Sequence, residues 1–182
     1  MNWDTSPSLE TVERTLVGAL ALSDASLIIH RGGVLVEFKT ETLQPGLAAT
    51  LEGNHRAWQI GPFSGHHCHL NLTLVTRVWF DAEPVSCQDG RLNYTVWFLS
   101  AEDCGNPYRP EGLFSVALNA PYRHDGSARY ELIEAVYTLR DSLRHEAGVF
   151  SSEGFLAARS QVCPAAAENR TLSNDQTKHL RV

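Results

Sequence analysis

The chain has 182 residues, of which 43% are hydrophobic and 20% are charged, a balance typical of a globular domain with its own core. Its net charge of -6 argues against general nucleic-acid binding, because that function needs a basic surface to neutralise phosphates. No apolar run approaches the roughly 20 residues that cross a bilayer, so no membrane insertion is expected.

The cysteines and the first residues bear on the cellular compartment. The four cysteines are far apart and form no Cys-x-x-Cys pair. The opening Met1-Asn2-Trp3-Asp4 does not lead into a basic region followed by an apolar core, as a secretory signal would. Free thiols and a cytoplasmic location are therefore expected.

Apolar periodicity predicts a helix, a series of strands and a second helix. The first helix follows the N-cap candidate Ser8 and covers 9–23, where apolar residues recur every three or four positions. The second helix is capped by Ser127 and ends at Gly148. The strands are expected at 27–30, 34–39, 57–60, 66–74, 76–80, 91–100 and 113–118.

The remaining segments are interpreted as connections. Residues 81–89 are expected to form a loop that closes at the hairpin dipeptide Asp89-Gly90, and 101–112 an irregular loop. Within residues 40–53, Pro45-Gly46 is a turn signal, and residues 47–51 suit either a helical turn or a strand. Residues 164–182 are polar and predict a disordered tail, which leaves 1–163 as a single domain.

This order of elements predicts an α+β fold, an antiparallel β-sheet meander with the N- and C-terminal helices packed on one face. The other face of the sheet is then free or packs on a second subunit, so a homodimer is expected.

The histidines point to a chemical site. His66, His67 and His69 are three of the eight histidines in the chain. The strand period of two places His67 and His69 on one face, about 6.5–7 Å apart, and turns Cys68 toward the core. Imidazole is the commonest ligand of zinc, copper and iron, so His67 and His69 are candidate ligands for a divalent transition metal. A third ligand would come from a distance, and the candidates are His55, His124, Glu83 and Asp81.

Of two other interpretations of this stretch, the first stays open. The histidines also suit a polar strand face exposed to solvent. A nucleophilic role for Cys68 between two imidazoles is not expected, because alternation buries that thiol. The chain has no nucleophile elbow, Walker loop or dinucleotide-binding fingerprint, so no catalytic residue is assigned and enzymatic activity is left open.

A longer pattern runs from the histidines into the following strands. Its parts are His67-x-His69-Leu70-x-Leu72, Val75-x-x-Val78-Trp79-Phe80, Asp89-Gly90, Tyr94-Thr95-Val96-Trp97-Phe98-Leu99 and Leu113-Phe114-Ser115-Val116. Over residues 57–145 this pattern resembles the bacterial haem-utilisation proteins, which are haem carriers and haem-degrading proteins. The resemblance implies an antiparallel sheet with flanking helices, dimerisation or paired repeats, and haem bound by a histidine, here His69 or His67.

Haem needs an axial imidazole, an apolar slot and cations for its two propionates. The expected cofactor-binding residues are His69, His67, His66, Arg77 and Trp79. Further candidates for the slot and the propionates are Trp58, Trp97, Tyr94, Phe114, Arg91 and Arg123. The alternative is that these aromatic residues form the core and that the arginines are solvated.

Three functional hypotheses follow. The first is a small cytosolic haem-binding protein that carries, stores or uses haem. The second is a non-haem metalloprotein that uses His67 and His69. The third is a homodimeric interaction module without a cofactor.

Overall fold

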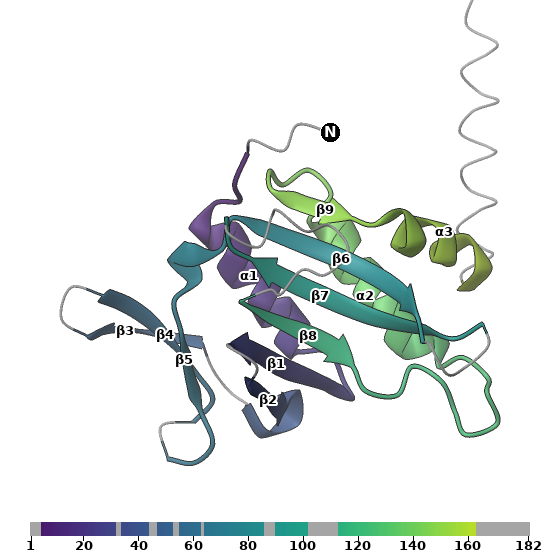
Figure 1. Cartoon of the computed structure of the whole chain (residues 1–182), viewed down its shortest axis with the longest axis horizontal. Helices are drawn as coiled ribbons and strands as arrows, with labels where there is room; N and C mark the ends of the chain where they lie inside the picture. The colour runs from purple at the N-terminus through teal and green to yellow at the C-terminus, as the bar shows by residue number, and fades with distance from the viewer. Residues whose placement is uncertain are drawn as a thin grey trace, which may run out of the picture.

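Two sheets and three α-helices make up the described part of the chain (Figure 1). The computed structural model describes residues 5–31, 34–43, 47–52, 55–62, 64–85, 90–101 and 113–162. The elements are α1 (Leu9–Leu20), β1 (Ala25–Arg31), β2 (Val34–Lys39), η1 (Thr40–Leu43), β3 (Leu47–Glu52), β4 (His55–Ile60), β5 (Cys68–Leu70), η2 (Leu72–Leu74), β6 (Arg77–Pro84), β7 (Leu92–Leu99), β8 (Phe114–Leu118), α2 (Tyr130–Ser142), β9 (Val149–Ser151) and α3 (Glu153–Val162).

The larger sheet has six strands in the order β2-β1-β8-β7-β6-β9, and the smaller has the order β3-β4-β5. Strands β6, β7 and β8 form an antiparallel meander, as predicted, and β1 joins it by pairing with β8. Strand β9 is the exception, because it pairs with β6 in parallel. The predicted α+β fold is confirmed, although the strands form two sheets rather than one.

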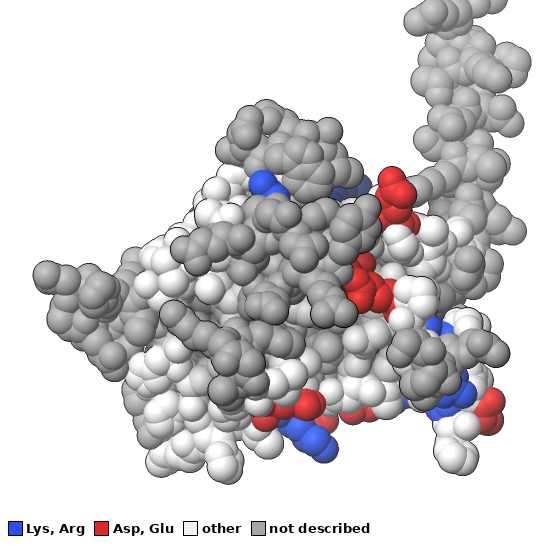
Figure 2. All heavy atoms as spheres, in the orientation of Figure 1, with Lys and Arg blue, Asp and Glu red and all other residues white. Residues whose placement is uncertain are grey.

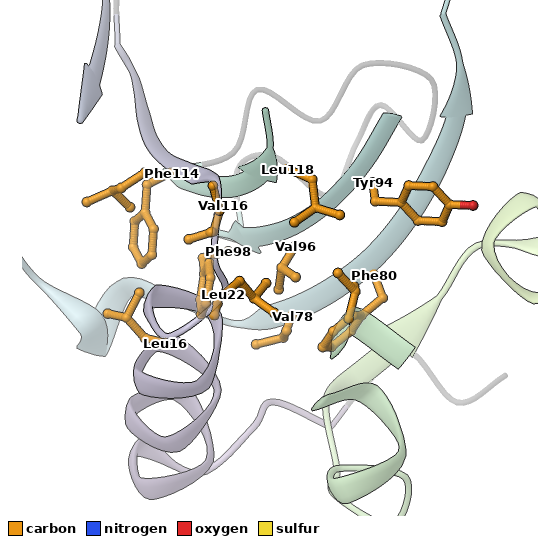
Figure 3. Packing of buried hydrophobic residues seen from close by; sticks show 14 of the residues in the cluster. Leu16, Leu22, Val78, Phe80, Tyr94, Val96, Phe98, Phe114, Val116 and Leu118 are labelled. Carbon is orange, nitrogen blue, oxygen red and sulfur yellow. The ribbon is translucent and has the colours of Figure 1, made fainter. Parts of the chain in front are cut away.

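The core lies between the six-stranded sheet and the helices, of which α1 and α2 run behind that sheet in Figure 1. Leu16 of α1 and alternate residues of the strands, such as Val78 and Phe80 of β6, are buried together (Figure 3). The rings of Phe98 and Phe114 stack at 4.5 Å between centroids. Burying one such side chain stabilises the fold by roughly 1.5–3 kcal/mol. The prediction that the helices pack on one face of the sheet is confirmed.

Both predicted helices are shorter than the sequence pattern indicates. Helix α1 ends at Leu20, and the chain turns at Asp24, which has a φ of 52°. Helix α2 begins at Tyr130 because Ser127 does not cap it. The hydroxyl and backbone N–H of Ser127 both donate to Oδ1 of Asp125 instead, closing a local turn. Helix α2 also ends at Ser142, well before the predicted end.

The strand predicted over 66–74 is wrong for most of its length. Only Cys68–Leu70 form a strand, and Leu72–Leu74 form a 3-10 helix. Oδ1 of Asn71 accepts the backbone N–H of Thr73, and this local bond diverts the chain from the sheet.

Other boundaries also differ from the prediction. Residues 81–84, expected in a loop, extend β6 and pair with β7. Strand β9 and helix α3 were not predicted. The expected loop residues 102–112 and the expected tail 164–182 lie outside the described residues. None of the described helices is long and apolar enough to cross a membrane.

Candidate functional site

The three clustered histidines lie around the edge strand of the smaller sheet. His69 belongs to β5, where it pairs with Gln59 of β4, and His66 and His67 precede the strand. All three imidazoles are exposed. The loop before them depends on Gly61, whose φ is 103° and where a Cβ would lie 2.6 Å from the carbonyl oxygen of His66.

His67 and His69 form a close pair. Their ring centroids are 5.4 Å apart and their planes are inclined by 51°. Nδ1 of His67 lies 3.0 Å from the carbonyl oxygen of Gly65. A carbonyl only accepts hydrogen bonds, so Nδ1 must be the donor. In the neutral ring the lone pair then lies on Nε2, which is the arrangement that metal-binding histidines adopt.

Cys68 points away from the two imidazoles. Its side chain is half-buried against the hydrophobic core, and its thiol is free. Burial raises the pKa of the Cys68 thiol to about 11. The thiolate needed for nucleophilic chemistry is therefore scarce near neutral pH.

The candidate third metal ligands do not complete a site in the described residues. Asp81 and Glu83 belong to β6 of the other sheet, and no group of three histidine, cysteine or acidic side chains that could hold a metal is found in the part of the chain that the structure describes. Burial, and then the charge of Asp81, raise the pKa of Glu83. His124 lies in an exposed turn, and the side chain of His55 is outside the description.

Arg77 and Trp79 lie on β6, on the face of the six-stranded sheet that points away from the core. Trp79 is opposite Trp97 of β7 and next to Phe150 of β9, whose ring centroid is 6.3 Å away. We call Phe150, Trp79 and Trp97 the aromatic row. All three are partly exposed, and the register continues the row to Ser115 of β8.

Ser115 is buried below the surface of this face. Its side-chain oxygen has no hydrogen-bond partner in the part of the chain that the structure describes. On the view in Figure 2, the charged side chains of the described residues stand in small separate groups, with no broad basic patch among them.

The remaining candidates have structural roles. Trp58, Tyr94 and Phe114 are each only 1% exposed and belong to the core, and the indole N–H of Trp58 donates to Glu13. Among the arginines, Arg91 lies over the Tyr122 ring at 5.7 Å, and Arg123 is 3.6 Å from Glu131. These findings favour the core interpretation of the three buried aromatic residues.

The expected haem-binding residues thus divide between two sheets. The imidazoles lie at the edge of the smaller sheet, while Arg77 and Trp79 lie on the larger one. The donor chemistry fits haem iron, because the contact of Nδ1 with Gly65 leaves Nε2 of His67, on an exposed side chain, as the ring nitrogen that can act as a ligand. The sequence did not predict the Gly65 contact or the aromatic row, since the first depends on a loop carbonyl and the second on the undetected strand β9.

Comparison with known proteins gives the fold. No protein-family model matches the chain, and no curated protein does. The solved structure of the haem-binding protein ChuX is 12% identical and covers 76% of this chain and 76% of its own, with a TM-score of 0.53. A protein from Erwinia carotovora is 15% identical and covers 76% and 75%, with a TM-score of 0.52.

A protein from Agrobacterium tumefaciens is 13% identical and covers 78% of this chain and 73% of its own, with a TM-score of 0.50. At such low identity the likeness shows the fold alone. The resemblance to haem-utilisation proteins indicated by the sequence is confirmed at that level: the chain has the fold of the ChuX haem-binding proteins.

Proposed function

We propose that the protein binds haem, with Nε2 of His67 as the axial ligand. The observation that carries the proposal is the hydrogen bond from Nδ1 of His67 to the carbonyl of Gly65, which orients the ring and fixes its neutral tautomer. ChuX, which shares this fold, is a haem-binding protein, and this supports haem as the molecule bound here.

His69 is the second candidate ligand. The two rings project from the same edge of the smaller sheet at 5.4 Å between centroids, so a single haem iron placed there would be within reach of either ring. We therefore assign one imidazole to the iron and the other, together with His66, to the rim of the site. Of the two rings, His67 is favoured by its contact with Gly65.

We further propose that the protein is a cytoplasmic haem carrier. Bound haem would supply the iron that His67 ligates. The exposed position of the three histidines supports a carrier, because a ligand held at a sheet edge is accessible to the next acceptor. Arg77 is the proposed partner of a propionate, and Trp79 is the proposed apolar contact.

A hemin titration of the purified protein tests the haem proposal. The expected result is a saturable Soret band at one haem per chain or per dimer. His67→Ala should weaken the affinity by about tenfold or more, and His69→Ala by less. His145→Ala is the matched control, since His145 is equally exposed but lies after α2. Uptake that does not saturate, or that all three variants leave unchanged, would refute the proposal.

Metal analysis of the same sample separates the second hypothesis from the first. Stoichiometric zinc or copper that is lost on chelation, without a saturable Soret band, would favour a metal site at His67 and His69. A purified protein that contains no metal and does not bind hemin would favour the interaction module.

The role of Arg77 has its own test. Hemin dimethyl ester lacks the propionate charges, so it cannot form the proposed ion pair. Arg77→Gln should weaken binding of hemin but leave binding of the dimethyl ester unchanged. Equal losses for both ligands would show that Arg77 does not contact a propionate.

The proposed homodimer is favoured by the edge strand β2. Leu35 and Val36, on its two faces, are 59% and 40% exposed, and exposed apolar edge strands tend to pair with another chain. Val36→Lys should shift the protein toward monomer in sedimentation experiments. A dimer that persists in this variant would exclude the β2 edge as the contact.

A further inference from the structure

A groove of about 770 Å³ runs between α1 and α2. Its lining is mostly apolar or small and includes two glutamates and two hydroxyl-bearing residues. Gly18 of α1 and Glu131, Leu132, Glu134 and Leu139 of α2 are among the residues that line it. The helices approach closely at Gly18, where a Cβ would lie 2.4 Å from a methyl carbon of Leu139.

The groove carries negative charge that is only partly compensated. Its lining includes Glu131 and Glu134 but no lysine or arginine. Glu131 is 3.6 Å from both Arg123 and Arg129. Glu134 is exposed and has no ion-pair partner among the described residues. A ligand with an apolar side chain flanked by cations would complement this surface.

The chain itself contains such a segment. Residues 177–182 read Thr-Lys-His-Leu-Arg-Val, which places Lys178 and Arg181 three positions apart around Leu180. Glu131 and Glu134 are also three positions apart, on consecutive turns of α2. We propose that residues 177–182 of this chain bind in the groove, with the two cations at the two glutamates and Leu180 on the apolar floor.

The segment that connects α3 to residues 177–182 is long enough to reach the groove. Helix α3 is held against α2 by the ion pair between Arg159 and Asp141, in which Nη1 lies 2.8 Å from the carboxylate. Asp141 and Glu131 are ten residues apart on α2, which is about 15 Å along the helix. The 14 residues 163–176 that follow α3 reach up to about 46 Å when extended.

Residues 177–182 belong to the same chain as the groove, so a weak contact is sufficient for them to bind there. Exposed ion pairs each contribute little to binding. A segment on the same chain, however, is present at an effective concentration on the order of millimolar. Burial of Leu180 together with the two exposed pairs therefore has to supply no more than a millimolar affinity to populate the bound state.

Carbodiimide cross-linking of the intact chain tests the proposal. The reagent joins a lysine amine directly to a carboxylate, and the chain has only two lysines, Lys39 and Lys178. The expected product joins Lys178 to Glu134 or Glu131 within one chain, and mass spectrometry of the digested protein identifies it. Mixing isotopically labelled and unlabelled protein distinguishes links within a chain from links between chains.

Two variants sharpen the test. Glu134→Gln should lower the yield of the Lys178 link at least severalfold, and the products of Lys39 should not change. The double variant Glu134→Lys with Lys178→Glu exchanges the two charges, and it should restore a link between the same two positions. Lys178 links spread over unrelated carboxylates, links only between chains, or no Lys178 link at all would overturn the proposal. The outcome does not depend on haem, so it is separate from that of the hemin titration.

Discussion

Two buried tyrosines offer a paired test of how hydrogen bonding stabilises the core. Tyr94 of β7 and Tyr137 of α2 are each 1% exposed, and their rings meet edge to face at 6.2 Å between centroids. The hydroxyl of Tyr137 donates to the carbonyl oxygen of Phe155 at 2.9 Å. Among the described residues, the hydroxyl of Tyr94 has no partner at hydrogen-bonding distance and angle. Burial raises the pKa of Tyr94 far above its usual value, and the neighbouring Tyr137 and Tyr122 raise it further.

The two phenylalanine substitutions should therefore have different effects on the free energy of unfolding. Tyr137→Phe removes one buried hydrogen bond, whose net value is about 0.5–1.5 kcal/mol. Tyr94→Phe removes a buried hydroxyl that makes no compensating hydrogen bond, and burying such a group costs about 1–3 kcal/mol. We expect Tyr94→Phe to be neutral or stabilising, and the two variants to differ by about 2 kcal/mol.

Urea unfolding followed by circular dichroism measures both values, provided that the variants share one m-value. The double variant should show the sum of the single effects to within the coupling expected for rings in contact. A loss of stability in Tyr94→Phe as large as in Tyr137→Phe would refute the reasoning. It would show that the Tyr94 hydroxyl is hydrogen-bonded, with Tyr122 the first group to examine.

Two further predictions concern backbone strain and a thiol. Gly148 and Gly90 have φ values of 71° and 72°, but a Cβ at Gly148 would lie 2.3 Å from Pro7, whereas at Gly90 it would meet nothing within 4 Å. Gly90→Ala should cost about 1–2 kcal/mol in chemical denaturation, and Gly148→Ala clearly more; equal costs would contradict the contact. Because burial raises the pKa of Cys68 to about 11, its alkylation rate should keep rising as the pH passes 10, and a plateau by about pH 10 would mean an exposed thiol with an ordinary pKa.

The sequence predicted those features of the fold that depend on neighbouring residues. Helix α1 was found from its apolar repeat, and its cap is real, since the side chain of Ser8 accepts the backbone N–H of Thr11. The β6–β7 hairpin was indicated by a glycine turn, and Gly90 has the positive φ that favours glycine. In each case the signal and the structure lie within one short segment.

Features set by distant contacts were missed. Strand β9 has three residues, too few for a period, and exists because it pairs with β6. The separation of β5 from the larger sheet was also not predicted, because the local bond at Asn71 decides it. For the candidate site, the period of two predicted that His67 and His69 are neighbours, but no pattern in the sequence places the Gly65 carbonyl against His67.

The short connection between the two sheets limits how one haem could use both halves of the proposed site. Residues 71–76 join β5 to β6, and within them Leu72 and Val75 are 1% and 5% exposed. Because these two side chains are anchored in the core, the relative position of His67 and Arg77 is fixed by packing. A haem that needs both residues must lie across this connection, and then both His67→Ala and Arg77→Gln will weaken binding. If only His67→Ala does so, the haem is held at the sheet edge alone and the aromatic row is left for another contact.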